Sequence, residues 1–247
     1  DGTMGGVYRL GADILSIAVL VGMTALAIRR FVFRPAALRV RETTWLHPRA
    51  KRGIQRDSAI VAGFILLHVG GRFLGETFHL AESGADAWQP IASAVSGLWT
   101  GWSPGALEIA QHASWWMALG LILGFIPYFP ISKHIHLFFA PLNFLLKPER
   151  LSIGQLDPLD FDDQTVDQFG VSRLEDLSYA GLMDAFACIM CNRCQDACPA
   201  YATGKVLSPA ALEINKRYFL NQEGNRLAAG QASSQTLPEF AIPAEAV

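Results

Sequence analysis

Three apolar runs before residue 130 of this 247-residue chain are long enough to cross a lipid bilayer. They cover residues 12–28 (extendable to Phe33), 58–80 and 106–126. A transmembrane helix needs about 20 predominantly apolar residues. Charged residues make up 17% of the chain, whereas soluble proteins carry roughly 25%, and the deficit lies before residue 150. The pattern predicts a membrane part followed by an extramembrane part.

Two segments admit a second interpretation. Residues 87–103 are moderately apolar, rich in tryptophan and followed by Pro104. We interpret them as an interfacial or re-entrant helix, with a fourth span as the alternative. The first run can also be compared with a secretory signal, but a signal has its basic residues before the apolar stretch. Here the arginines follow the run, which favours a transmembrane helix.

Basic residues predict the orientation in the membrane. No lysine or arginine occurs between His79 and Ser132, whereas the segment between the first two runs is rich in both. By the positive-inside rule, residues 29–56 and the chain after about residue 130 are cytoplasmic. A fourth span at 87–103 would reverse this, so three spans of an inner-membrane protein are expected. The basic residues of the first segment are Arg29, Arg30, Arg34, Arg39, Arg41, Arg49, Lys51, Arg52 and Arg56.

Histidines in and beside the apolar runs are candidate haem ligands. Ionisable groups inside a span are costly and usually functional. His68 and His79 are separated by about 16 Å of helical rise and about 20° of rotation, so they share a helix face. Pairing His79 with His112, and His68 with His134, would hold two b haems, with His136 as the alternative inner ligand. One alternative is a single haem. The other is no haem, with the histidines hydrogen-bonded between helices or at the interface.

Arg72 lies between the two histidines of the second run and is predicted to bind a haem propionate. The alternative is an ion pair with Glu76, four residues further on the same helix. Gly70, Gly71 and Gly75 are expected to let a porphyrin approach the backbone. These residues complete the predicted haem environment.

All four cysteines lie in one run, CIMCNRCQDACP, with the spacing of a bacterial-type iron–sulfur ligand run. In such a run the first three cysteines hold one cluster and the fourth ligates another. We therefore predict Cys188, Cys191 and Cys194 on one [4Fe-4S] cluster and Cys198 on a second. Zinc usually takes two separated ligand pairs, and a disulfide is disfavoured on the cytoplasmic side. A second cysteine run is expected after Val247 or on a partner chain.

The extramembrane part is predicted to be helical. Pro127 and Pro130 are expected to end the third run, and residues 131–148 to form an amphipathic surface segment. Residues 172–190 have helical periodicity, with a capping box of Ser172 and Glu175. A second helix begins after Ser208 as N-cap. No basic cluster with interleaved aromatics occurs in this part, so no nucleic-acid partner is expected.

The ordered motifs LLHVGGRFLGETFHL, HASWW, PYFPISKHIHLFFAPLN and CIMCNRCQDACPAYATGKVLSP resemble membrane-bound iron–sulfur oxidoreductases of the heterodisulfide-reductase-like type. In these proteins a cytochrome b domain, similar to the gamma subunit of respiratory nitrate reductase, is fused to a ferredoxin module. The resemblance covers about residues 10–220. It departs at Met190 and Asn192, where relatives often have an acidic residue and glycine. A second cysteine run and CCG domains, present in the family, are absent from this sequence.

Together these observations predict an all-α chain with three parts. A transmembrane helical bundle of cytochrome b type covers residues 1–146, half of a ferredoxin-like module 147–225, and a linker or tail 226–247. The resemblance implies electron transfer between cytoplasmic [4Fe-4S] clusters and membrane b haems or quinone. It also implies a cytoplasmic partner such as electron transfer flavoprotein. The alternatives are a haem-free membrane-anchored ferredoxin and a non-catalytic subunit of a larger respiratory or photosynthetic complex.

Overall fold

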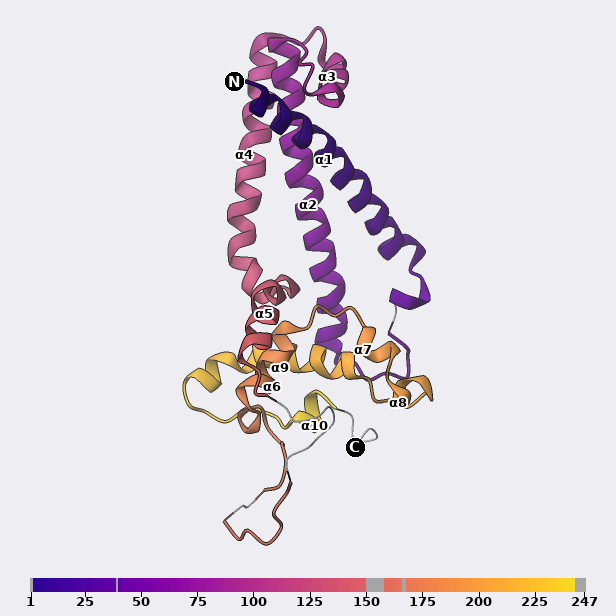
Figure 1. Cartoon of the computed structure of the whole chain (residues 1–247), viewed down its shortest axis with the longest axis vertical. Helices are drawn as coiled ribbons and strands as arrows, with labels where there is room; N and C mark the ends of the chain where they lie inside the picture. Colours follow the sequence, from indigo (N-terminus) through magenta and orange to yellow (C-terminus); the bar gives the residue numbers. More distant parts are fainter. Residues whose placement is uncertain (1, 39, 150–157, 166–167, 243–247) are drawn as a thin grey trace. The chain divides into compact units, whose positions relative to one another are not determined.

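The computed structural model describes residues 2–38, 40–149, 158–165 and 168–242. Within these ranges every regular element is a helix and no strand occurs, which confirms the all-α prediction (Figure 1). The chain divides into two compact units. Unit 1 consists of residues 1–39 and 56–128, and unit 2 of residues 40–55 and 129–247.

Three long helices dominate unit 1. They are α1 (Gly2–Ile28), α2 (Pro48–Ser83) and α4 (Pro104–Tyr128), and the first eight residues of α2 are counted with unit 2. With the helical turns that continue α1 and α4, all three are long and apolar enough to cross a membrane. The prediction of three spans is confirmed among the described residues. Between α2 and α4 lies α3 (Pro90–Ser96), whose seven residues are far too few for a fourth span.

The helices of unit 1 pack through a small apolar cluster and through glycines. Phe73 and Leu80 of α2 are buried against Ala92 of α3 and side chains of α1. On another side of α2, a Cβ atom added at Gly71 would lie 2.7 Å from the Met117 side chain of α4. One turn further, Gly75 approaches Ser114 of α4 in the same way. The expectation that these two glycines admit a porphyrin is therefore wrong, because α4 takes the space.

The third span does not end at its first proline. Pro127 lies inside α4, which continues to Tyr128 before a short 3-10 helix, Phe129–Ile131. The Tyr128 hydroxyl donates a hydrogen bond to Asp57 Oδ1 of α2 at 2.5 Å. Pro127 removes one backbone donor from the last turn, and α4 ends at the next residue.

Unit 2 is a group of shorter helices around one apolar core. Its largest buried side chains include Leu174, Phe219 and Phe240. Residues 226–242, assigned from the sequence to a linker or tail, contribute Leu237, Phe240 and Ala241 to this core. The helices are α5 (His136–Leu146), α6 (Tyr179–Ala187), α7 (Arg193–Asp196), α8 (Pro199–Ala202), α9 (Pro209–Ala228) and α10 (Leu237–Phe240).

Hydroxyl caps fix where the helices of unit 2 begin. The Ser208 hydroxyl accepts a hydrogen bond from the Ala211 amide at the start of α9, as predicted. The capping box predicted at Ser172 and Glu175 is wrong. The Asp176 carboxylate instead accepts from the Ser172 and Arg173 amides around a 3-10 turn, and Ser178 caps α6 two residues later.

Candidate functional site

The cysteine run is placed between two helices of unit 2. Cys188 is the C-cap of α6, and α7 contains Cys194, while Cys198 is the N-cap of α8. All four cysteines are free thiols; Cys191 and Cys194 are exposed and the other two are half-buried. The helix ends therefore fix the position of the loop, and its sulfur atoms remain accessible.

Two residues of the loop have left-handed backbone conformations. Met190 has φ 61° and Asn192 has φ 63°, so they flank Cys191 on both sides. This conformation is tolerated by Asn and costs other residues about 1–2 kcal/mol. It bends the chain back so that the Met190 amide donates to Cys188 Sγ at 3.3 Å. Asn is one of the few residues other than glycine that adopt this conformation readily, which suits position 192.

Electrostatics of the cysteine loop are set by burial and by a few neighbours. Burial raises the pKa of the Cys188 thiol, opposed by the hydrogen bond from Met190 and by the nearby Arg217 charge. Burial also raises the pKa of Cys194. Among the described residues no group of three or more His, Cys, Asp or Glu side chains is arranged to hold a metal ion. The cysteines remain candidate ligands because of their donor type and their spacing. The Met190 amide directed at Cys188 Sγ also suits an iron–sulfur cluster, whose sulfur atoms accept such hydrogen bonds.

Arg217 of α9 connects the cysteine loop to another segment of unit 2. Its guanidinium, in a side chain that is only 2% exposed, donates to the Cys188 carbonyl at 3.2 Å and to the Ser132 carbonyl at 2.5 Å. It also lies 5.8 Å from the centre of the Phe186 ring. One buried cation therefore fixes both the start of the cysteine run and the residue that precedes Lys133. The sequence offered no signal for this role.

The two candidate histidines of unit 2 follow Ser132 directly. The Ser132 hydroxyl accepts from the His134 amide at 3.1 Å, and a 3-10 turn leads to His136 at the start of α5. His136 Nδ1 lies 2.7 Å from the Lys133 carbonyl oxygen, and the two imidazole rings are 6.4 Å apart. An Nδ1 that donates to a carbonyl leaves Nε2 as the metal-binding nitrogen. His136 has this arrangement with a backbone carbonyl.

Part of the predicted basic loop belongs to unit 2. The Arg41 guanidinium donates to the Tyr201 carbonyl at 2.6 Å and lies 4.0 Å from the centre of its ring. The His47 amide donates to Asn215 Oδ1, and the His47 ring stacks on Phe240 at 4.0 Å. Burial and then the Arg49 charge lower the pKa of His47. The loop that follows the first span is therefore fastened to α8, α9 and α10 by specific contacts.

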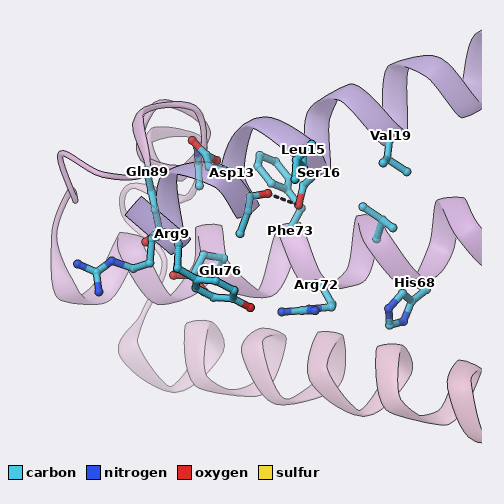
Figure 2. Close-up of a pocket in the computed structure, with 14 residues that line it drawn as sticks. Arg9, Asp13, Leu15, Ser16, Val19, His68, Arg72, Phe73, Glu76 and Gln89 are labelled. Carbon is cyan, nitrogen blue, oxygen red and sulfur yellow. Dashed lines mark hydrogen bonds between the residues drawn. The ribbon is translucent and has the colours of Figure 1, made fainter. Parts of the chain in front are cut away.

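A cavity of about 380 Å³ lies in unit 1 between α1, α2 and α3 (Figure 2). Its α2 wall contains His68, Arg72 and Glu76, one turn apart from each other. His68 Nδ1 lies 3.1 Å from the Ala118 carbonyl of α4, so this ring also keeps Nε2 available. In Figure 2 the Arg72 and His68 side chains leave the same side of α2. The α1 wall adds Tyr8, Arg9, Asp13 and Ser16.

The ion pair suggested for Arg72 does not form. Glu76 Oε1 instead accepts a hydrogen bond from Gln89 Nε2 at 3.0 Å. Within the described part of the chain Arg72 makes no hydrogen bond or ion pair, and its side chain is exposed. A guanidinium without a carboxylate beside a cavity can bind an anionic group of a ligand.

The predicted outer pair of histidines is not part of the cavity. His79 is exposed and does not line it. His112 is also exposed, and its Nε2 lies 3.9 Å from Glu108 Oε1 one turn away on α4. The structure thus brings His68 and Arg72 to one cavity and leaves His79 and His112 outside it. The cavity itself, and Asp13 within it, were not indicated by the sequence pattern.

Comparison with known proteins identifies a class of relatives, the iron–sulfur electron-transfer proteins. Over 182 residues, 71% of this chain, it is 35% identical to a probable iron–sulfur-binding oxidoreductase, FadF, of Bacillus subtilis. It is 25% identical over 95% of its length to an EtfAB:quinone oxidoreductase of Syntrophomonas wolfei. Over 43% of its length it is 32% identical to a probable membrane-anchored ferredoxin of Chromohalobacter salexigens.

The matches cover only part of each relative. The chain spans 25% of the Bacillus protein, 32% of the Syntrophomonas protein and 17% of the Chromohalobacter protein. No family model and no solved structure matches the chain. The names of these relatives are consistent with the iron–sulfur electron-transfer class that the cysteine run and the apolar helices predict.

Proposed function

We propose that this chain is the membrane-anchored part of an iron–sulfur oxidoreductase and carries electrons between [4Fe-4S] clusters and a redox group in the membrane. The observation that carries the proposal is the loop of free cysteines, with the Met190 amide directed at Cys188 Sγ, in a chain that also has three apolar helices. The names of the relatives support it. An iron–sulfur cluster, when bound, supplies one-electron transfer.

The cysteines have separate roles in this proposal. Cys188, Cys191 and Cys194 hold one cluster, and Cys198 reaches a second cluster that is completed by cysteines outside this chain. The alternation of basic segments supports a cytoplasmic position for the module. There, by analogy with the Syntrophomonas relative, electron transfer flavoprotein is the proposed soluble partner and quinone the membrane partner.

The test uses the protein in which this chain occurs, purified anaerobically in detergent. We expect iron and acid-labile sulfide, and an electron paramagnetic resonance signal of reduced [4Fe-4S] clusters. Iron-free protein, with no such signal after anaerobic reconstitution with iron and sulfide, would overturn the proposal.

A b haem is proposed at His68 of unit 1, beside the cavity that Arg72 also lines. His68 has Nδ1 at a backbone carbonyl oxygen, which leaves Nε2 for iron. In unit 2, His136 has Nδ1 at the Lys133 carbonyl oxygen, and both His134 and His136 remain candidate ligands. Arg72, without an ion-pair partner, would bind a propionate. His79 and His112 remain candidates for an outer haem but have no comparable support. A reduced-minus-oxidised spectrum should contain a b-type alpha band that His68→Ala removes and His47→Ala retains.

A second candidate is a membrane-anchored ferredoxin without haem. It is favoured by the exposure of His79 and His112 outside the cavity and by the Chromohalobacter relative. In that case the cavity of about 380 Å³ would hold a quinone head group, since pockets of about 300–1,000 Å³ are usual for small ligands. Iron–sulfur clusters without an alpha band in the purified protein would select this candidate.

A further inference from the structure

Helix α5 of unit 2 has two faces of different character. On one face the Phe139 ring lies 5.3 Å from the Phe186 ring of α6. One turn further, buried Asn143 donates to Asp184 Oδ1 of α6 at 2.6 Å. These contacts follow the helical repeat from His136 and form a stripe that fixes α6 to α5.

The opposite face of α5 is apolar and uncovered. Phe144 is 89% exposed and Leu145 is 80% exposed, which is unusual for side chains of this size. No charged residue occurs between Lys133 and Lys147, so a lysine stands at each end of the helix. The exposed apolar residues of α5 are Leu137, Phe138, Leu142, Phe144, Leu145 and Leu146.

The composition of this face indicates a lipid partner. The large side chains on the exposed face of α5 are only Leu and Phe, and in-plane membrane helices carry such residues on the face that enters the acyl-chain boundary. Eleven residues give about 16 Å of helix, too short for a hydrocarbon core of about 30 Å. Only residues 132–135 separate α5 from the third candidate span, Pro104–Ile131. Lys147 Nζ lies 3.5 Å from Asp184 Oδ1 of α6, so the charge at this end of the helix is directed to α6 and the Leu and Phe face carries none.

We propose that α5 is an in-plane membrane helix. Its Leu and Phe face lies in the acyl-chain boundary, and its Phe139–Asn143 stripe holds α6. Because Cys188 follows α6 directly, this arrangement keeps the cysteine loop at the bilayer surface. The inference rests on exposure, charge and helix length, and it holds whether or not the cysteines bind iron.

Photo-crosslinking in the full-length protein tests it. p-Benzoylphenylalanine replaces Phe144 in one variant and Phe161 in the other, which is 72% exposed outside α5. Both are reconstituted in nanodiscs of phosphatidylcholine and phosphatidylglycerol, irradiated, and analysed by mass spectrometry. We expect phospholipid adducts at position 144 and none at 161. Adducts at 144 to protein only, or equal lipid adducts at both positions, would overturn the proposal.

A charge-insertion variant gives an independent readout. In nanodiscs, Phe144→Glu with Leu145→Glu should increase amide hydrogen exchange in α5 by about tenfold or more, since the helix loses its lipid contact. The matched pair Leu159→Glu with Phe161→Glu, also at exposed residues, should leave α5 unchanged. Unaltered exchange of α5 in the first pair would contradict burial in lipid.

Discussion

In unit 1 the buried carboxylate of Asp13 accepts the amides of Ile91 and Ala92 at the start of α3, at 2.8 and 3.0 Å. In unit 2 the buried guanidinium of Arg217 binds the carbonyls of Ser132 and Cys188, which lie in different segments. The first contact satisfies donors that every helix start leaves free. The second joins the Cys188 carbonyl, at the end of α6, to the Ser132 carbonyl, which also accepts from the Ile135 amide. Asp13 and Arg217 are similarly buried, but Asp13 stabilises one short helix, whereas Arg217 holds the start of the cysteine run.

The two units also differ in where their apolar side chains go. Unit 1 buries a small cluster around Phe73 and Leu80 and exposes most of its large apolar residues, as a bundle in lipid would. Unit 2 has a core of its own around Leu174, Phe219 and Phe240. Substitutions in unit 2 should therefore affect folding more than equivalent substitutions in unit 1.

The largest expected effect is at the cysteines. Replacing Cys194 by Ser should abolish the cluster held by the first three cysteines, because a hydroxyl is a much poorer ligand than a thiolate for iron–sulfur iron. Iron and sulfide analysis with electron paramagnetic resonance measures this loss. Ile189→Val, at an exposed residue of the same loop, is the control and should keep full iron content. Full iron content in the serine variant would remove Cys194 from the ligand set.

The next effect should come from Arg217. Arg217→Met leaves the Cys188 carbonyl without its side-chain donor and removes one of the two donors to the Ser132 carbonyl. It should cost about 1–3 kcal/mol of unit 2 stability, the usual range for a buried polar group that loses its partner. Hydrogen exchange should increase in α6, α9 and the cysteine loop, while α1 and α4 keep their protection. Lys205→Met, at an exposed cation, should cost little. Equal effects of both substitutions would show that the buried contacts are unimportant.

Asp13 should have a smaller and more local effect. Asp13→Ala removes the acceptor for two α3 amides and should cost about 1–2 kcal/mol, the usual range for a lost cap. Exchange should increase in residues 90–96 and remain unchanged in α6. Glu82→Ala removes an exposed carboxylate of α2 and serves as the control. If the amides of α3 stay fully protected from exchange in Asp13→Ala, Asp13 does not hold the start of α3.

The smallest effect should be the pH dependence of the His47 contact. Because burial lowers the pKa of His47, the neutral ring is favoured in the folded chain. Its contribution to stability is complete above pH 6.5, its ordinary pKa, and is lost as the pH falls through the lower, folded value. The protection factors of amides in residues 40–55, measured relative to the intrinsic exchange rate at each pH, should therefore fall on acidification. His47→Phe should remove this pH dependence while keeping the stack on Phe240.

Features with a local pattern were predictable, and features made by distant contacts were not. Apolar length indicated the three spans, and Ser208 followed by Pro209 indicated the start of α9. The contact of Arg41 with Tyr201, and those of Arg217, join residues far apart in sequence and carry no periodic signal. The capping box failed because Asp176, one residue beyond Glu175, had the geometry to accept both amides.

In the candidate site, the cysteines and His68 were predicted from residue type and spacing and remain predictions. The cavity beside His68 is formed by the packing of three helices and had no sequence signal. Gly71 and Gly75 show why the sequence was ambiguous. A glycine permits close approach of a cofactor or of a helix, and only the position of Met117 and Ser114 decides between them.

Residues 40–55 pack against the helices of unit 2, and this packing should restrict which residues related sequences carry at the contact. Gly53 lies directly under the Tyr218 ring, so any side chain there would collide with it. The two positions should therefore change together in evolution, with a larger residue at 53 accepted only where 218 is small. That covariation would allow genome sequences alone to reveal which homologues keep the loop docked.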